Sequence, residues 1–295
     1  MSRAGSPAHP RARRSPTARA RLAGWARLCA LVLTLGLAGC ISEDREQELG
    51  DRIAAQINAQ LPLVRDPALH LYVNRLGGLI ARKSDRPDVP YRFYIVDSPG
   101  VNAFALPGGH IYVNRGLIER TSDVSELSAV LAHEIGHVAA RHGAQSLERQ
   151  LRTGSLISVL YRVILGGEPE LLDQTALRLG HTLWTASHSR QAELQADELA
   201  VRYLIEAGVD PRGIITFLKG LLREEAATER RTLSLEWFST HPMTEERIRQ
   251  TQEEIGEELP EASPGLARDI ASYPAFLRRV RALPPPPIPH PVPHP

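Results

Sequence analysis

Cysteine is almost absent from this chain of 295 residues, in which Cys29 and Cys40 are the only two. Two cysteines exclude the disulfide framework by which many small exported domains are stabilised. Charge of one sign is lacking too, because 35 Lys and Arg face 34 Asp and Glu. This near-equal balance of charges gives no indication of a nucleic-acid partner, and we expect no such partner.

Long apolar runs are also lacking. The two of note cover residues 28–37 and 156–165, and both are too short to span a bilayer comfortably as a helix. The second contains Arg162, and we expect a core helix there, with a partly membrane-facing helix as the alternative. The first has the length of a signal-peptide core, and seven arginines and no acid precede it.

The first run ends at Leu37-Ala38-Gly39-Cys40, which is similar to the lipobox of bacterial lipoproteins. In such signals cleavage falls before the cysteine, and the cysteine thiol takes a diacylglycerol. We therefore predict a lipoprotein signal peptide over 1–39 and lipidation of Cys40. An ordinary signal peptide with an incidental cysteine, or an uncleaved anchor, is the alternative.

Removal of residues 1–39 would lower Lys and Arg from 35 to 28 and leave Asp and Glu at 34. The basic arm is therefore a feature of export, and the exported chain is acidic. Ile41 follows the cysteine, where bacterial lipoproteins retained at the inner membrane tend to have Asp. The resemblance implies a periplasmic protein that is lipid-anchored to the outer membrane rather than the inner one.

The remaining chain suits one domain, which we place at 40–258, followed by an extension over 259–295. Prolines crowd residues 284–295, and this tail is expected to be extended and polyproline-like. Helical periodicity and capping signals predict helices over 43–60, 67–82 and 189–207, after Pro211, and from Pro242 to about 257. A strand is predicted over 92–96, and a hairpin over 103–113 with a turn at Pro107-Gly108-Gly109. This order predicts a predominantly helical α+β domain.

The stretch His133-Glu134-Ile135-Gly136-His137 carries the most chemistry. Residues four apart lie on one helical face, so the two histidines can hold one zinc ion together, and Glu134 can reach a water on that metal. Asp123 or Ser122 can cap this helix, with Glu126 in a capping-box position if Asp123 is the cap. A small residue at position 136 is consistent with close backbone packing. The alternative is a chance histidine pair.

A catalytic zinc usually has three protein ligands, so a further ligand must come from elsewhere. Glu193 is the best candidate, and Asp197 lies four residues later on the same helical face. The carboxylate of Asp197 could accept a hydrogen bond from the free ring nitrogen of a ligand histidine. Taken without the upstream histidines, Glu193, Asp197 and Glu198 would be a solvated acidic face.

These residues resemble the gluzincin metallopeptidases of the HtpX and CAAX-prenyl-protease group, peptidase family M48, over roughly 45–257. The resemblance implies a zincin-like domain with a small edge-strand sheet, one Zn²⁺ per chain, and a substrate strand at Asn102, Ala103, Phe104 and Ala105. His241 matches a histidine that in some relatives can approach the zinc and keep the enzyme latent. Arg247 would point towards the site and could stabilise an oxyanion, or else be a surface charge.

The expected activity is zinc-dependent hydrolysis of peptide bonds, with His133, His137 and Glu193 as ligands and Glu134 as general base. The expected substrates are misfolded or stalled envelope proteins. A latent or non-catalytic, chaperone-like zinc-bound binder of envelope proteins is the alternative. A purely structural zinc module fits poorly, because cysteine ligands are missing and Glu134 would be idle.

Overall fold

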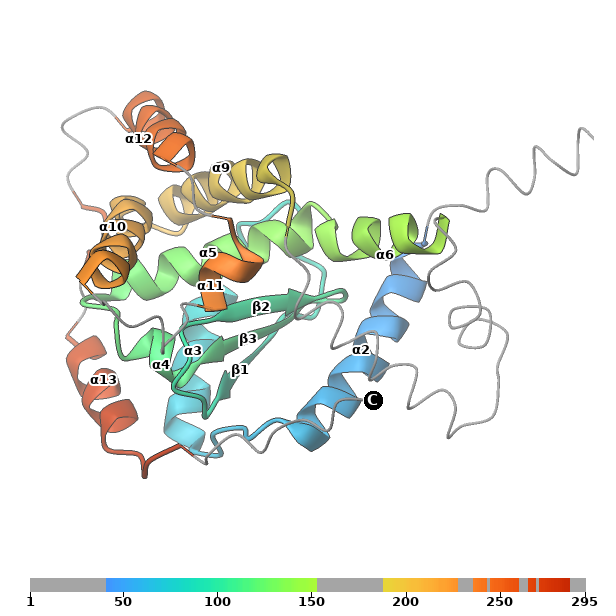
Figure 1. Ribbon diagram of the computed structural model, residues 1–295, viewed down its shortest axis with the longest axis horizontal. Coiled ribbons are helices and arrows are strands. Elements are labelled where there is room, and N and C mark those ends of the chain that lie inside the picture. The colour runs from blue at the N-terminus through green and yellow to red at the C-terminus, as the bar shows by residue number, and fades with distance from the viewer. Residues whose placement is uncertain are drawn as a thin grey trace, which may run out of the picture. The chain divides into compact units, whose positions relative to one another are not determined.

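A computed structural model of the chain describes residues 41–152, 188–227, 236–242, 245–259, 265–268 and 271–286. The predicted signal peptide, Cys40 and the apolar run at 156–165 lie outside these residues. All described elements belong to the unit Ser42–Pro295 (Figure 1). In chain order they are α2 (Glu43–Gln60), α3 (Pro67–Ala81), β1 (Arg92–Val96), β2 (Ala103–Leu106), β3 (His110–Asn114), α4 (Arg115–Ile118), α5 (Val124–Ala139), α6 (His142–Arg152), α9 (Arg190–Glu206), α10 (Arg212–Ala227), α11 (Glu236–Thr240), α12 (Glu245–Glu258) and α13 (Tyr273–Arg281).

The three described strands form one sheet in the order β1-β3-β2. Strand β1 runs parallel to β3, whereas β2 and β3 form the predicted antiparallel hairpin. Gly108 and Gly109 have φ angles of 79° and 88°, a region that side chains with a Cβ rarely adopt. The turn chemistry therefore fixes the hairpin, and it leaves β2 at an edge of the sheet. The fold is the predicted α+β arrangement, with helices in the majority.

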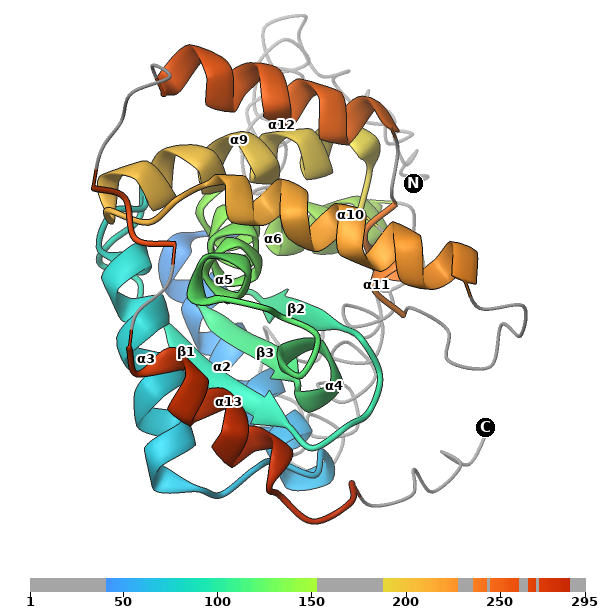
Figure 2. The same cartoon turned by 90° about the vertical axis from the view of Figure 1, so that its left-hand side faces the viewer.

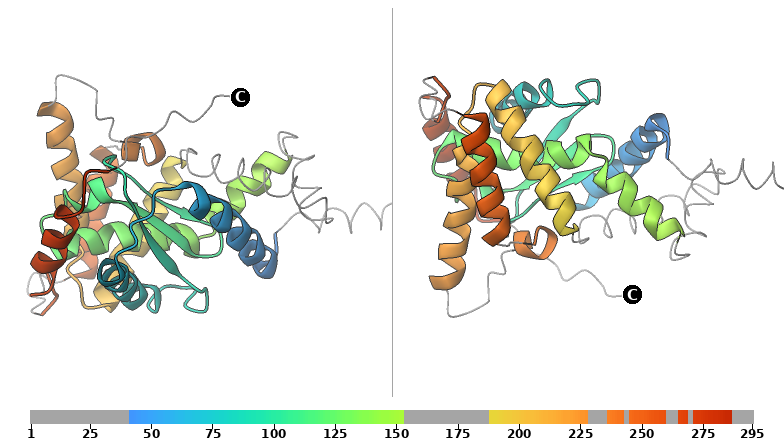
Figure 3. Two further views of the ribbon diagram at one scale, coloured as in Figure 1. Left: turned by 90° about the horizontal axis from the view of Figure 1, so that it is seen from below. Right: turned by 90° about the horizontal axis from the view of Figure 1, so that it is seen from above.

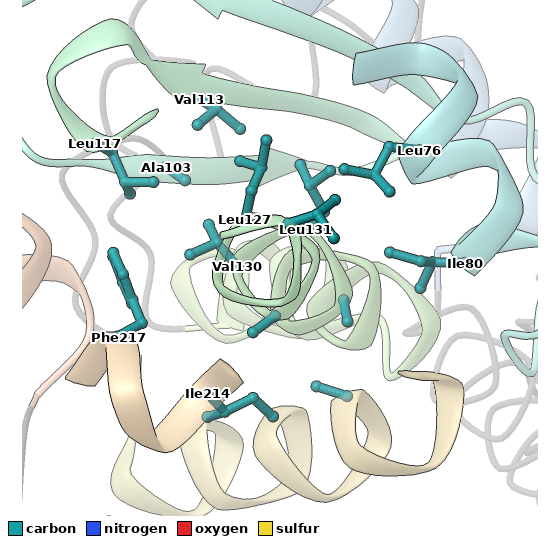
Figure 4. Close-up of a cluster of buried hydrophobic side chains, with 14 of the residues drawn as sticks. Leu76, Ile80, Ala103, Val113, Leu117, Leu127, Val130, Leu131, Ile214 and Phe217 are labelled. Atoms are coloured by element: carbon teal, nitrogen blue, oxygen red, sulfur yellow. The ribbon is translucent and has the colours of Figure 1, made fainter. Parts of the chain in front are cut away.

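Helix α5 lies at the centre of the fold, between the sheet and helices α9 and α10 (Figure 2). Every residue from Val124 to Val138 is buried, as expected for a helix with neighbours on all sides. Leu127 and Leu131 face the sheet, while Ile214 and Phe217 of α10 approach from the other side (Figure 4). Complete burial of one such leucine stabilises the fold by roughly 1.5–3 kcal/mol.

Side-chain caps fix where the two central helices begin. Asp123 accepts the backbone N–H of Glu126 at 3.1 Å, and the carboxylate of Glu126 accepts the backbone N–H of Ser122 at 2.7 Å. This satisfies the first turn of α5 much as the capping box predicts. Ser189 caps α9 by accepting the backbone N–H of Ala192.

Helices α5 and α9 approach closely at Gly136. A Cβ atom added there would lie 2.9 Å from the carbonyl oxygen of Ala196, so only glycine permits this contact without a shift. The sequence-based expectation of close backbone packing at position 136 is thereby confirmed. On its far side, α9 lies against α12 (Figure 3).

The C-terminal part of the chain contains a helix that the sequence did not predict. Helix α13 packs on α3, where Phe276 stacks on Tyr72 with ring centroids 4.1 Å apart. Helix α13 belongs to the same compact unit as the other described elements. The boundary between a domain over 40–258 and a C-terminal extension stays a prediction. None of the helices in the described ranges is both long and apolar enough to cross a bilayer.

Candidate metal centre

Four buried side chains converge where α5, α9 and the end of α11 meet. His133 and His137 come from α5, Glu193 from α9, and His241 directly follows α11. One ligand atom from each lies within 4.8 Å of all the others. The Nε2 atoms of His133 and His137 are 3.0 Å apart, and Nε2 of His137 lies 3.3 Å from Oε1 of Glu193.

These spacings match a single small cation. Ligands about 2.0–2.1 Å from a tetrahedral zinc ion lie roughly 3.3 Å from one another. Two imidazole nitrogens and a carboxylate oxygen are also a donor set that zinc accepts. The residues therefore fit a metal ion, and the structure brings together the three side chains that the sequence proposed as ligands.

Asp197 lies behind His133. Its Oδ1 is 2.8 Å from Nδ1 of His133, so the ring presents Nε2 to the other ligand atoms. Arg247 holds Asp197 in turn, with Nε and Nη2 at 2.8 and 2.9 Å from the two carboxylate oxygens. The Nη1 atom of Arg247 lies 2.7 Å from Oε2 of Glu193. One buried guanidinium thus fixes both carboxylates.

Arg247 points towards the site, as the sequence suggested, and is not a surface charge. The residue is 1% exposed, and its guanidinium faces Asp197, Glu193 and the carbonyl of Pro242. In this structure Arg247 holds the two carboxylates, and its stabilisation of an oxyanion stays a prediction. Its planar, forked donors suit the two-point contact with Asp197.

Burial and neighbouring charges shift the pKa values of the side chains in this cluster. Burial lowers the pKa of His133, but the hydrogen bonds to Asp197 and Glu193 outweigh it and raise that pKa to about 10. Burial opposes ionisation of Asp197, yet the charge of Arg247 and the contact with His133 hold its pKa below the usual value. The carboxylates are therefore anionic at neutral pH and ready to attract a cation.

Glu134 has a different environment. It is completely buried, and neither carboxylate oxygen accepts a hydrogen bond from a described residue. Nε2 of His241 lies 3.5 Å from Oε1 of Glu134. Burial raises the pKa of Glu134. A buried carboxylate with a raised pKa takes up a proton more readily than a solvated one, as a general base requires.

His241 occupies the remaining place among the ligand atoms. Its Nδ1 lies 3.2 Å from both oxygens of Glu193 and 3.2 Å from Nε2 of His133. The indole of Trp237 stacks on its ring, with centroids 4.1 Å apart. The imidazole is thus fixed from outside and directed at the position that the other ligands surround.

Sequence reasoning missed three aromatic side chains around the centre: His142, His188 and Trp237. Nδ1 of His142 lies 2.8 Å from Nδ1 of His137, and its Nε2 lies 3.1 Å from Oε1 of Gln195. If His137 binds metal through Nε2, its Nδ1 donates to His142 and His142 donates to Gln195. The sequence shows a histidine five residues after His137, but this spacing alone does not place the two rings together. The turn at Arg141, with φ 59°, brings His142 next to His137.

The proposed substrate strand borders the centre. Asn114 donates its backbone N–H to the carbonyl of Asn102, so the N–H and C=O groups of Ala103 and Ala105 face away from β3. Phe104, between them, is buried and stacks on Tyr112. Ala103 and Ala105 therefore present the groups with which a further strand could pair.

Comparisons with known proteins agree with this arrangement. The chain is 31% identical over 213 residues to a protein of Yersinia pestis named beta-barrel assembly-enhancing protease. The matched residues make up 70% of this chain and 43% of the relative. The protein of the same name from Escherichia coli K12 is 30% identical with the same coverage. Mitochondrial metalloendopeptidase OMA1 of Schizosaccharomyces pombe is 32% identical over 200 residues, which are 66% of this chain and 56% of that protein.

The chain spans less than half of the length of the bacterial relatives it matches. The family pattern of the M48 peptidases covers residues 67–255, which include β2 and all the residues of the candidate centre. Most of the described fold lies within this match. The chain therefore belongs to peptidase family M48.

Proposed function

We propose that this chain is a zinc-dependent endopeptidase of the bacterial cell envelope that degrades misfolded or stalled envelope proteins. The observation that carries the proposal is the buried carboxylate of Glu134, which accepts no hydrogen bond from a described residue, beside the ligand atoms of His133, His137 and Glu193. The names of the relatives, a beta-barrel assembly-enhancing protease and a metalloendopeptidase, support the same reaction class.

His133, His137 and Glu193 would hold one zinc ion, with Asp197 fixing the ring of His133. A bound zinc ion supplies Lewis acidity towards a carbonyl oxygen and lowers the pKa of its water towards neutrality. Glu134 accepts the proton of the attacking water and delivers it to the leaving amine. The raised pKa of Glu134 makes this carboxylate a stronger base for the first half of the transfer.

Ala103 and Ala105 would bind the substrate backbone. Their outward N–H and C=O groups lie at the sheet edge beside α5, so a substrate paired with β2 runs past the metal centre. Backbone pairing recognises an extended segment rather than one sequence. It suits an enzyme that acts on unfolded polypeptides.

The anchor and the location belong to the same proposal. Cys40 would carry a lipid that tethers the domain to the periplasmic side of a membrane, the outer one in preference to the inner. The name of the bacterial relatives, which refers to β-barrel assembly, supports an envelope location. Labelling of cells with a palmitate analogue tests it, because Cys40→Ser should lose the label.

A second function is supported by His241, whose Nδ1 lies among the ligand atoms. With this ring as a fourth ligand, no open position is left for water, and the chain would be latent or a chaperone-like binder of envelope proteins. The two functions need the same residues and differ in whether His241 leaves.

Digestion of casein by the purified protein, with and without a chelator, separates them. The endopeptidase proposal expects cleavage that a chelator abolishes and added zinc restores, and a gain in His241→Ala. Zinc content measured on the same samples must be close to one ion per chain. Zinc-loaded protein that cleaves nothing, even as His241→Ala, would leave the binder as the function.

A further inference from the structure

A cavity of about 290 Å³ opens beside the candidate metal centre, between α6 and the first turn of α9. This is near the lower end of the size of small-molecule pockets, about 300 Å³, so it suits one or two side chains rather than a large ligand. Residues that line it include Ala105, His142, Gln145, Arg149, His188 and Gln195. Neither the metal ligands nor Glu134 are among its lining residues.

The cavity adjoins His137 through two of its lining residues. Two of its walls, His142 and His188, contact that histidine directly: His142 at 2.8 Å between Nδ1 atoms, and His188 by stacking with centroids 4.0 Å apart. A side chain in the cavity would therefore lie one imidazole ring away from the bond that the centre attacks. This position suits a residue adjacent to the scissile bond.

The strand edge leads to the same place. Ala105 lines the cavity, and its backbone N–H and C=O face away from β3. A peptide paired with Ala105 would direct alternate side chains to the side on which the cavity lies. Backbone pairing and the cavity can thus act on the same substrate segment.

The described residues that line the cavity carry charge of one sign. Among them Arg149 alone is charged, and the other polar members carry amide, hydroxyl or imidazole groups. Arg149 is exposed, and in the described part of the chain it forms no ion pair. A guanidinium that lines a polar cavity and has no carboxylate partner among the described residues attracts an anion and repels a cation.

We propose that this cavity is a specificity subsite for an acidic substrate side chain, Asp or Glu, and that Arg149 determines the preference. The proposal rests on the proposed endopeptidase function. The other polar groups, such as the amide of Gln195 and the hydroxyl of Ser146, provide further contacts for a carboxylate in the cavity. Lys and Arg side chains are disfavoured in the same position.

Two measurements on the full chain test the subsite. In the first, the enzyme cleaves a library of peptides, and residue frequencies on either side of the cut are counted. We expect Asp and Glu to be enriched about three- to tenfold over Lys and Arg at one position, the range of a partly exposed ion pair. Arg149→Ala should remove the enrichment, and Arg149→Glu should reverse it. Arg75→Glu, an equal change of charge on the exposed face of α3, should leave it unchanged.

In the second measurement, fluorescence anisotropy follows the binding of peptides that differ only by Glu or Lys at that position. The protein is the inactive variant Glu134→Gln, with and without the additional substitution His241→Ala. Binding should follow the same order and the same dependence on Arg149. An acidic preference that survives Arg149→Glu, or no preference at all, overturns the subsite. A wild-type enzyme that cleaves nothing contradicts the endopeptidase instead, and the binding order then decides the subsite by itself.

Discussion

The backbone N–H of Trp237 donates to the carbonyl oxygen of Val101 over 2.9 Å. This bond joins α11 to the beginning of the proposed substrate strand. Thr240 adds a second connection, since its hydroxyl lies 3.3 Å from Oδ1 of Asn102. His241 follows directly, with its backbone N–H 2.7 Å from the carbonyl of Trp237. The strand that would bind substrate and the histidine that approaches the ligands are thus mechanically connected.

Weakening this connection should raise proteolysis if His241 restrains the site. Thr240→Val removes the hydroxyl contacts to Asn102 and to the carbonyl of Trp237 at nearly constant volume. Loss of one neutral hydrogen bond costs about 1 kcal/mol, so we expect a gain of about fivefold in kcat/KM, below that of His241→Ala. Thr216→Val, which loses a comparable bond to the carbonyl of Gly213 in α10, is the matched control. Equal rates in wild type and Thr240→Val would contradict the restraint.

Glu134→Gln should separate chemistry from metal binding. The amide keeps the volume of the buried carboxylate but cannot accept the proton of the attacking water. We expect kcat to fall about 10²- to 10⁴-fold with zinc content unchanged. Stopped assays on a fluorogenic peptide, with metal analysis of the same preparation, measure both. Retention of full activity would exclude Glu134 as the base.

Asp197→Asn should weaken metal binding without removing a ligand. The substitution reduces the attraction for the His133 ring and leaves part of the Arg247 charge uncompensated. Loss of such a supporting carboxylate typically costs 10- to 100-fold in metal affinity. Competition with a chromogenic chelator gives the affinity. Asp85→Asn, which breaks an exposed pair with Arg202, should leave it unchanged.

Much of the centre could be predicted from sequence because its spacing is local. His133 and His137 are one helical turn apart, and so are Glu193 and Asp197, which makes each pair visible without a fold. The hairpin was equally visible, since Pro107-Gly108-Gly109 specifies its turn.

The rest depends on contacts between distant segments. Whether Arg247 faces solvent or Asp197 is decided by how α12 packs on α9, 50 positions earlier in the chain. Likewise, the contact between Trp237 and His241 is local, because both lie in or next to the short helix α11. The attachment of α11 to the sheet is not local, because it depends on the bond from Trp237 to the carbonyl of Val101. The periodicity of a sequence does not predict such contacts, because an amphipathic helix can bury its apolar face against many different neighbours.

The α9–α12 contact also has a titratable group away from the centre. Burial, with the nearby charges of Glu198 and Asp197, raises the pKa of Glu254 from its usual 4.5 to about 7. The folded state therefore holds a proton between pH 4.5 and 7 that the unfolded chain has released. The free energy of unfolding consequently falls as pH rises through this window, and the penalty is complete above pH 7.

Glu254→Gln removes that penalty. Because solvent screens this partly exposed side chain, we expect a gain of only about 1 kcal/mol in the free energy of unfolding at pH 8, and little change at pH 4.5. Urea titrations at the two pH values measure it. Glu253→Gln on the same helix is the control: its carboxylate lies 2.8 Å from Arg249, so this variant should not gain stability at pH 8. Equal gains in both variants would show that lower net charge, rather than the buried position of Glu254, is the cause.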